Sequence, residues 1–275
     1  MTHNKYSPSE ALFHKWIKEG RGQGKGQDYK PWLTVRDVPS LGRSHRIFGF
    51  KSQRTHHLLS DLELAAFFIL EWHPQTQDVR EQYPLQRDIT LEVAQEAGIK
   101  HPATSGVANY MSTDFLVNTS AAARPLFAIQ AKRSEDLTNA RTIEKLEIER
   151  RYWKQTGIPW FILTERDIPT AVTRNIEWLY PSQAESAISN DLAQQLEFYE
   201  HQLQENPTAT LVALSKSIDM AYDLELGQSL RELRQLLAKR FFSFDIRIEF
   251  RQLTGADLTL SSTIETLEAV HTSDK

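Results

Sequence analysis

Asp114, Gln130 and Lys132 are the residues whose types and spacing could support chemistry. Asp114 lies in the run 111–117 and the other two lie in the run 126–132, and each run is short, apolar and partly β-branched, as strands are. The segment between the runs is typical of a turn, so we expect a hairpin. Because Gln130 and Lys132 are two positions apart, their side chains share one face of the strand, where Asp114 can lie beside them.

An acid, an amide and an ammonium group on one face of a core strand need partners, because buried strands rarely carry such groups otherwise. A hard divalent cation is the partner that fits, since it takes carboxylate and amide oxygens as ligands. We therefore expect Asp114 and Gln130 to bind a metal ion while Lys132 acts on a water. The alternative for Lys132 is a strand-end lysine in solvent.

Glu63 is a further candidate, with two possible roles. Residues 60–72 predict a helix, and Glu63 lies in its first turn. Ser60 and Glu63 have the spacing of a capping box, in which the glutamate closes on a backbone amide. The residues alone therefore favour a cap over catalysis. Both roles can hold in part, because a helix N-terminus fixes a side chain rigidly.

The composition is that of an ordinary globular protein of 275 residues, 40% apolar and 25% charged. This length is long for one domain and comfortable for two. The sequence has no cysteine, which excludes disulfides and thiolate metal sites and suits a cytoplasmic location. No stretch approaches the ~18 apolar residues of a membrane helix, so we expect no membrane partner.

Positive charge gathers near the N-terminal end. Residues 1–60 hold eleven Lys and Arg against four Asp and Glu, a net of +7, so the other 215 residues carry −11 within a total of −4. Such asymmetry is expected where one face meets phosphates, with a solvated basic arm as the alternative. The candidate DNA contacts are Arg21, Lys25, Arg43, Arg46, Lys51 and Arg54. The adjacent His56 and His57 favour packing or phosphate contact over a transition-metal site, because neighbours on an extended backbone point apart.

The order of predicted elements in the first part of the chain indicates an α/β fold. A strand at 78–85, a helix at 88–98, the hairpin, an amphipathic helix at 139–155 and an apolar strand at 157–164 follow one another. The last strand is expected to run parallel to its neighbour, reached through the preceding helix. These elements predict a mixed sheet flanked by helices. We interpret the many charges of helix 139–155 as a solvated face.

After residue 168 the pattern becomes mostly helical. Apolar residues recur at helical spacing in 171–180, 183–204, 208–222 and 229–240, and residues 242–250 alternate like a half-buried strand. Helices followed by a strand and turn are typical of a small winged-helix-like module. We therefore expect two domains, an α/β domain at 1–168 and a mostly helical, winged-helix-like domain at 169–275.

The spacing of Asp114, Gln130 and Lys132 resembles the nuclease core of the restriction-endonuclease superfamily, in which the second position is usually Asp or Glu. One family tolerates Gln there, and the chain closely resembles it: TnsA, the endonuclease subunit of heteromeric Tns-type transposases. The co-linear residues include Gly20-Arg-Gly-Gln-Gly24, Gly42-Arg-Ser-His-Arg46, His56-His-Leu-Leu-Ser-Asp-Leu-Glu63, Met111-Ser-Thr-Asp114, Gln130-Ala-Lys132, Glu147-Ile-Glu-Arg-Arg-Tyr-Trp153, Asn175-Ile-Glu-Trp-Leu-Tyr180 and Ala221-Tyr-Asp-Leu-Glu-Leu-Gly227.

This resemblance implies a restriction-endonuclease-like fold and a site in which Glu63, Asp114 and Lys132 are catalytic and Glu63, Asp114 and Gln130 bind metal. Mg²⁺ is the expected cofactor, because it accepts few protein oxygens and keeps waters that can be ionised, and Mn²⁺ can substitute. Lys132 would orient or deprotonate the attacking water. With a neutral Gln130 in place of an acid, metal affinity should be weaker than in the Asp or Glu versions.

The resemblance also implies a DNA endonuclease that nicks the 5′ ends of a mobile element, on the non-transferred strand, during cut-and-paste excision. Its implied partners are transposon-end DNA, a DDE-type transposase subunit (TnsB-like) and an ATPase regulator (TnsC-like) docked on the C-terminal domain. Its implied location is the bacterial cytoplasm, at the nucleoid when assembled. The alternatives are a stand-alone restriction or repair nuclease and a catalytically silent adaptor on the same fold.

Overall fold

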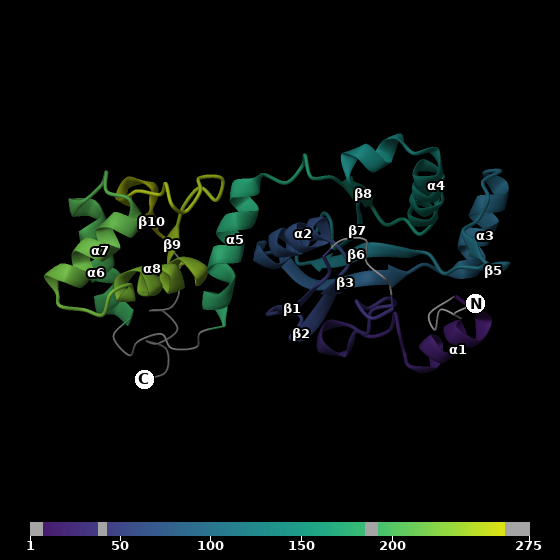
Figure 1. The fold of residues 1–275 in the computed structure, drawn as a ribbon, viewed down its shortest axis with the longest axis horizontal. Coiled ribbons are helices and arrows are strands. Elements are labelled where there is room, and N and C mark those ends of the chain that lie inside the picture. Colours follow the sequence, from purple (N-terminus) through teal and green to yellow (C-terminus); the bar gives the residue numbers. More distant parts are fainter. Residues whose placement is uncertain (1–7, 38–42, 185–191, 262–275) are drawn as a thin grey trace. The chain divides into compact units, whose positions relative to one another are not determined.

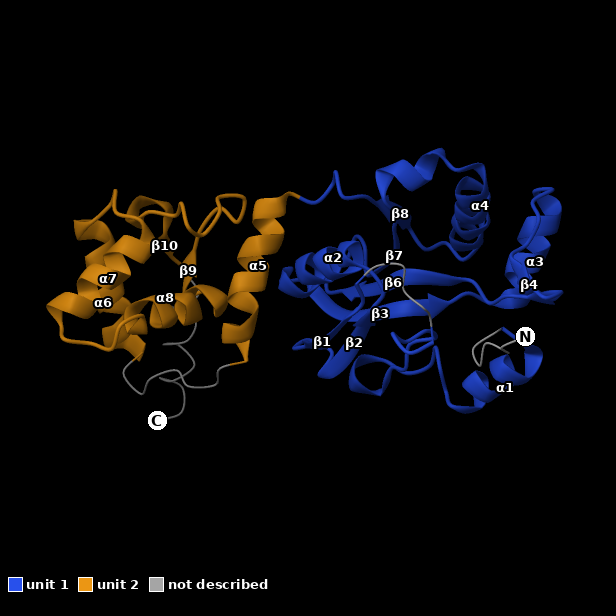
Figure 2. Ribbon diagram, viewed as in Figure 1, with its two compact units in different colours: residues 1–168 blue, residues 169–275 orange. Residues whose placement is uncertain are grey.

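The computed structural model describes residues 8–37, 43–184 and 192–261. Within it the chain divides into two compact units, residues 1–168 and residues 169–275, drawn in blue and orange in Figure 2. The first unit contains the candidate residues of the site, which its sheet and helices position.

A four-stranded mixed sheet organises the first unit, in the order β3-β6-β7-β8 (Figure 1). Its strands are β3 (Thr76–Pro84), β6 (Ser112–Thr119), β7 (Leu126–Ala131) and β8 (Trp160–Leu163). β6 pairs antiparallel with both β3 and β7, whereas β8 runs parallel to β7. The predicted hairpin and the parallel last strand are therefore confirmed. Phe115 lies opposite Ile129, which brings Asp114 beside Gln130.

Three helices pack on this sheet: α2 (Asp61–Trp72), α3 (Arg87–Glu96) and α4 (Ala140–Gln155). α4 places Ile148 and Tyr152 in one core cluster with Leu116 of β6 and Ala128 of β7. α2 contacts β3 and β7. Local sequence explains where α4 begins, because the Asn139 side chain accepts a hydrogen bond from the Thr142 backbone N–H.

The N-terminal section adds a helix, a hairpin and several short elements to the first unit. Phe13 and Trp16 of the helix form an aromatic cluster with Trp32, and the hairpin strands pair antiparallel. Its elements are α1 (Glu10–Lys18), the 3-10 turn η1 (Gly26–Asp28), β1 (His45–Gly49) and β2 (Arg54–Leu58). Later in the first unit come β4 (Ala103–Thr104), β5 (Val107–Ala108) and the 3-10 turn η2 (Ser134–Thr138). The N-terminal section covers the backbone of β3, where the Trp32 N–H donates to the Gln82 carbonyl.

The second unit is mostly helical, as predicted. It consists of α5 (Thr170–Gln183), α6 (Leu192–Glu205), α7 (Leu211–Ala221), α8 (Gln228–Ala238), the 3-10 turn η3 (Gly255–Asp257) and a two-stranded ladder of β9 (Phe242–Ser243) with β10 (Thr259–Leu260). The predicted helix 183–204 spans residues 185–191, which lie outside the described part of the chain.

The predicted strand at 242–250 is wrong beyond Ser243. The backbone turns there, and Asn175 of α5 binds it, donating to the carbonyls of Ile246 and Ile248 and accepting from the Phe250 N–H. The Phe250 ring stacks on Trp178 at 4.3 Å. The alternating apolar residues of this segment thus pack against α5. A period of two in the sequence does not distinguish such packing from strand pairing.

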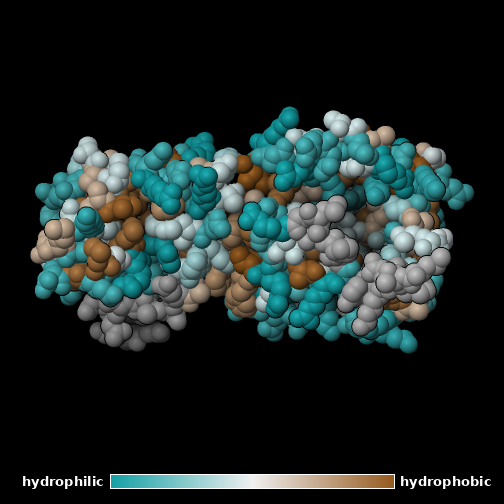
Figure 3. All heavy atoms as spheres, in the orientation of Figure 1, coloured by the Kyte–Doolittle hydropathy of each residue, from teal (hydrophilic) through white to brown (hydrophobic). Residues whose placement is uncertain are grey.

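No helix in the described ranges is both long enough and apolar enough to cross a membrane. On the face of the molecule drawn in Figure 3, hydrophilic residues prevail and brown, hydrophobic ones form smaller patches between them. The large buried side chains of the first unit, such as Phe67, Phe115 and Trp153, lie inside instead.

Candidate active site

Asp114 and Glu63 come from different elements and meet at one amide group. Asp114 is buried in the middle of β6, and Glu63 is buried in the first turn of α2. The Gln82 Nε2 atom of β3 lies 3.2 Å from Glu63 Oε2 and 3.2 Å from Asp114 Oδ1. The two carboxyl groups therefore face one small volume between α2 and the sheet.

Gln130 holds the other side of Asp114. Its Nε2 donates to Asp114 Oδ2 at 2.8 Å, and its Oε1 accepts from the Asp114 backbone N–H at 3.2 Å. The Ala131 N–H also donates to Oδ2, at 2.8 Å. These donors occupy Oδ2 and leave Oδ1 directed toward Glu63 and Gln82. The sequence prediction that Gln130 lies beside Asp114 is confirmed.

Glu63 is both a cap and a member of this site. Its backbone N–H donates to the N-cap Ser60 Oγ at 3.1 Å, and its Oε2 accepts from the N–H of Leu59, one residue before the cap, at 2.9 Å, in place of the Ser60 N–H of a standard capping box. Burial raises the pKa of Glu63 to about 8, helped by the nearby Asp114 charge and opposed by the hydrogen bonds from Leu59 and Ser60. The helix N-terminus thus fixes an acid that readily holds a proton when no cation is present.

Lys132 follows β7 directly, with its backbone N–H bonded to the Leu163 carbonyl at 2.9 Å. It is half-buried and lines a hollow of about 280 Å³ together with Gln130 and Glu149, so it is not a strand-end lysine in open solvent. The Asp114 carboxylate raises the pKa of Lys132, against the effect of burial, and Glu149 and Glu63 act in the same direction. The ammonium group is therefore held in its charged form beside the acids.

Glu149 of α4 is a buried acid that the sequence analysis missed. Its Oε1 accepts hydrogen bonds from Thr113 Oγ1 at 2.6 Å and from Trp160 Nε1 at 2.8 Å. Burial raises the pKa of Glu149 to about 8. The interpretation of the helix charges as a solvated face is wrong for this residue. A signal was available, because Glu149 lies three positions after Leu146 and four before Trp153, on the apolar stripe.

The donor set at this site fits a hard divalent cation. Asp114 and Glu63 offer carboxylate oxygens across one gap, with the Lys132 ammonium group nearby. The described residues contain no group of three or more His, Cys, Asp or Glu that could enclose a metal. A cation such as Mg²⁺ suits a sparse set, because it binds few protein oxygens and retains waters.

Comparisons with known proteins identify the family of the chain. Residues 73–165 match the family model described as TnsA-like endonuclease N terminal, and residues 167–246 match TnsA endonuclease C terminal. The chain is 50% identical over 256 residues to the transposon Tn7 transposition protein TnsA of Escherichia coli, with 93% of each protein covered. The chain belongs to the TnsA family. It is a TnsA-like endonuclease, and Asp114, Gln130, Lys132 and Glu149 all lie within the match to the N-terminal TnsA model.

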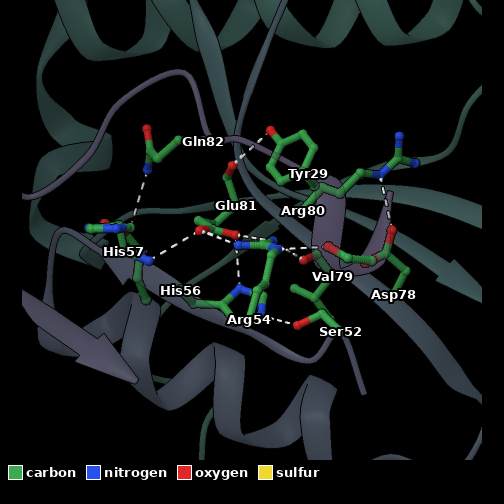
Figure 4. Close-up of polar contacts among 12 residues, drawn as sticks. Tyr29, Ser52, Arg54, His56, His57, Asp78, Val79, Arg80, Glu81 and Gln82 are labelled. Atoms are coloured by element: carbon green, nitrogen blue, oxygen red, sulfur yellow. Dashed lines mark hydrogen bonds and ion pairs between the residues drawn. The ribbon is translucent and has the colours of Figure 1, made fainter. Parts of the chain in front are cut away.

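Of the six predicted DNA contacts in this TnsA-family chain, Arg54 lies in the wrong place. Its guanidinium is buried and binds both carboxylate oxygens of Glu81 and the Val79 carbonyl. The same carboxylate accepts from His56 Nδ1 at 2.8 Å, and Figure 4 shows this buried cluster. Arg54 and His56 therefore stabilise the fold, in agreement with the packing role expected for the histidines.

The other five predicted DNA contacts differ in the ion pairs and hydrogen bonds that they make within the protein. Arg21 pairs with Asp37 at 2.7 Å, and the Lys51 ammonium donates to the His73 and Thr76 carbonyls. Arg43 is exposed and pairs with Asp61 at 3.2 Å, whereas Lys25 and Arg46 are exposed and have no ion pair with any described residue. Lys25, Arg43 and Arg46 are thus the members of the set that a phosphate can reach most directly.

Proposed function

We propose that this TnsA-like endonuclease is a metal-dependent DNA nuclease of a transposition machinery, which hydrolyses phosphodiesters at the 5′, non-transferred-strand ends of the transposon during cut-and-paste excision. The observation that carries the proposal is the meeting of Glu63 and Asp114 around one amide group, with the charged Lys132 beside them. Mg²⁺, for which Mn²⁺ can substitute, would be held by Glu63, Asp114 and Gln130.

Each protein group has a task that follows from its contacts. The Ala131 N–H and the Gln130 amide hold Asp114 Oδ2, so Asp114 Oδ1 faces Gln82 and the gap toward Glu63. Glu63 is held by the start of α2. A bound Mg²⁺ would supply Lewis acidity and an ionisable water. Because the pKa of Lys132 is raised, its ammonium group orients the water and stabilises negative charge on the phosphate rather than removing a proton.

The position of Gln130 supports a neutral ligand in this set. Its side-chain amide is occupied by Asp114, so the oxygen available here is a neighbouring main-chain carbonyl or, after rearrangement, the side-chain Oε1. The site then carries one negative charge fewer than a version with Asp or Glu there. Its affinity for the cation depends correspondingly more on phosphates of the bound DNA.

A basic hollow next to the site offers a path for that DNA. Lys15, Arg36, Arg46 and His57 line a hollow of about 570 Å³, and neither Arg36 nor Arg46 is ion-paired to another described residue. His57 is two residues before Leu59, whose N–H holds Glu63. A DNA strand bound in this hollow would therefore approach the segment that anchors Glu63.

The second unit carries apolar residues suited to a protein partner. Met220, Tyr222 and Leu226, on the end of α7 and the segment after it, are 74%, 54% and 77% exposed. Apolar side chains exposed next to one another favour protein–protein contact. We assign this surface to the ATPase regulator (TnsC-like), and the assembly to transposon-end DNA and a DDE-type transposase subunit (TnsB-like), in the bacterial cytoplasm at the nucleoid.

The test is a strand-resolved nicking assay with labelled transposon-end DNA, the transposase subunit, the ATPase regulator and Mg²⁺. The wild type should nick the 5′ ends, and Asp114→Ala should not, while both fold alike. Cutting of naked DNA by the purified chain alone would instead identify a stand-alone nuclease. A complete assembly that joins the 3′ ends but never nicks the 5′ ends, with Mg²⁺ or Mn²⁺, would identify a silent adaptor.

A further inference from the structure

Gln82 occupies the centre of the site, although neither its residue type nor its position in the sequence suggested a role. Its side chain is buried, at 3% exposure, and its Nε2 atom lies 3.2 Å from an oxygen of each acid, Glu63 and Asp114. Its Oε1 atom accepts a hydrogen bond from Ser112 Oγ at 3.1 Å. The amide thus stands in the gap that faces both carboxyl groups.

The backbone at Gln82 is unusual for a strand. Its φ is +48°, in the left-handed region that few residues other than glycine adopt. The ladder between β3 and β6 pairs Glu81 with Phe115 and Tyr83 with Thr113, and skips Gln82 and Asp114. The Trp32 N–H binds the Gln82 carbonyl on the far side. Strained backbone of this kind persists where the surroundings impose it, and it is enriched at functional sites.

Two adjacent side chains of β3 belong to different clusters. Figure 4 shows Glu81 directed into the cluster of Arg54 and His56, while the Gln82 side chain turns away from that cluster. Neighbouring side chains of a strand point to opposite faces, so the strand itself separates the two groups. The left-handed backbone at Gln82 further indicates that this position is constrained by its surroundings.

The Gln82 amide has two possible orientations at this position, one with its nitrogen and one with its oxygen facing the acids. With Nε2 facing the acids, its two protons satisfy one oxygen of Glu63 and one of Asp114. After a half-turn of the amide, Oε1 faces the same gap and Nε2 faces Ser112 Oγ. A hydroxyl both donates and accepts, so Ser112 serves either orientation. In the second state three side-chain oxygens meet at one point, a donor set for a hard divalent cation.

We propose that Gln82 is a reversible metal ligand: its amide N–H groups bridge Glu63 and Asp114 when the cation is absent, and its amide oxygen joins them when the cation binds. This inference rests on the proposed function, since it needs the same cation. It adds a third side-chain oxygen to a site where, among the described residues, no three His, Cys, Asp or Glu side chains group so as to hold a metal. It also gives the metal-free site a defined geometry instead of two repelling acids.

The experiment compares two substitutions by Mn²⁺ calorimetry and by thermal unfolding with and without Mn²⁺. Gln82→Met keeps the length and removes the amide, and it should weaken Mn²⁺ binding about 10- to 100-fold. Gln82→Glu keeps an oxygen but loses the donor. It should lower the metal-free Tm by placing three acids together, and it should show a larger Mn²⁺-induced rise in Tm than the wild type.

Gln53 provides a matched control. It is another glutamine in the left-handed region, with φ +54°, but its side chain is exposed and donates to the Phe50 carbonyl in the turn between β1 and β2. Gln53→Met should leave the Mn²⁺ affinity unchanged. Any general effect of losing a left-handed glutamine would appear in both Gln53→Met and Gln82→Met.

The outcomes separate this inference from the function on which it rests. If both Gln82 variants lower the metal-free Tm but bind Mn²⁺ as the wild type does, Gln82 is a structural link only and the inference is overturned. Loss of Mn²⁺ binding in Gln82→Glu would also overturn it. If Asp114→Ala binds Mn²⁺ like the wild type, the proposed metal centre itself fails, whatever the Gln82 variants show.

Discussion

Two buried carboxylates of the first unit, Glu81 and Glu63, lie on either side of one strand and have opposite surroundings. Glu81 is fully buried, and its charge is matched by Arg54 and His56. Burial alone would raise the pKa of Glu81, but the charges and hydrogen bonds of His56 and Arg54 hold it well below its usual range. Glu63 meets a second acid, Asp114, instead, and its pKa is raised to about 8.

This difference separates stabilisation from function. A buried acid with matched cations is satisfied within the fold, and breaking the match is costly. Two acids that face each other in a buried site do not both ionise readily, so Glu63 holds a proton until a cation from outside takes its place. Perturbed acids of this second kind are typical of functional sites. Glu81 of β3 belongs to the matched cluster with Arg54 and His56, and the next residue, Gln82, belongs to the site with Glu63 and Asp114.

Lys132→Ala should have the largest effect, because it removes the ammonium group beside the two acids. We expect nicking to fall by about 10³-fold or more, since both charge stabilisation and water orientation are lost. The strand-resolved nicking assay measures it, with thermal unfolding to show an intact fold. Lys154→Ala, at the exposed end of α4, removes the same charge away from the site and should nick normally. Equal rates for the two variants would remove Lys132 from the mechanism.

Glu81→Gln should destabilise the first unit by about 3–5 kcal/mol, because Arg54 would remain buried without its counter-charge. Urea unfolding measures the change. Glu147→Gln breaks partly exposed ion pairs with Arg150 and Arg151 on α4 and should cost only about 1 kcal/mol. Similar losses of unfolding free energy in the two variants would show that the buried Glu81 cluster does not stabilise the first unit.

Acid should weaken the fold through the same residue. The folded-state pKa of Glu81 lies below its value in the unfolded chain, so its ionised form stabilises the fold above roughly pH 4.3, the ordinary glutamate value. As the pH falls below that value toward the folded-state pKa, this contribution should be lost at up to about 1.4 kcal/mol per pH unit. Urea unfolding from pH 7 to pH 3 should therefore show a shallower decline in Glu81→Gln than in the wild type.

Gln130→Glu should have the smallest effect. It should lower the stability of the metal-free protein but raise its affinity for Mg²⁺. It adds a negative charge beside Asp114, so the metal-free protein should unfold at a lower temperature. Mg²⁺ should bind about tenfold more tightly, because a neutral oxygen becomes an anionic one. Calorimetric titration with Mg²⁺ measures the affinity. An unchanged titration would mean that the side chain at this position does not take part in metal binding.

The sequence predicted those parts of the site that depend on residues close together in the chain. The period of two in the runs around Asp114 and Gln130 predicted the hairpin, and the spacing of Ser60 and Glu63 predicted the cap that the structure shows. The resemblance to TnsA, rather than spacing, suggested that Glu63 also joins Asp114. Glu149 could have been found from its place on the apolar stripe of α4, but its charged neighbours concealed it.

Other features could not be read from neighbouring residues. The basic count near the N-terminus included Arg54, whose partner Glu81 is 27 positions away and lies in another strand. The alternation after Phe242 looked like a strand because packing against Asn175 and Trp178 of α5 imposes a similar pattern. In both cases the deciding contact is distant in sequence.

The sequence by itself determined the elements, the faces they bury and the caps at which helices begin, because those depend on hydrogen bonds and periodicities within a few residues. Only the tertiary structure decided which buried charge has a partner. It matched Glu81 with Arg54 and His56, left Glu63 facing Asp114, and turned Gln82 into the gap between them. Charge balance depends on distances across the fold, and only packing sets those distances.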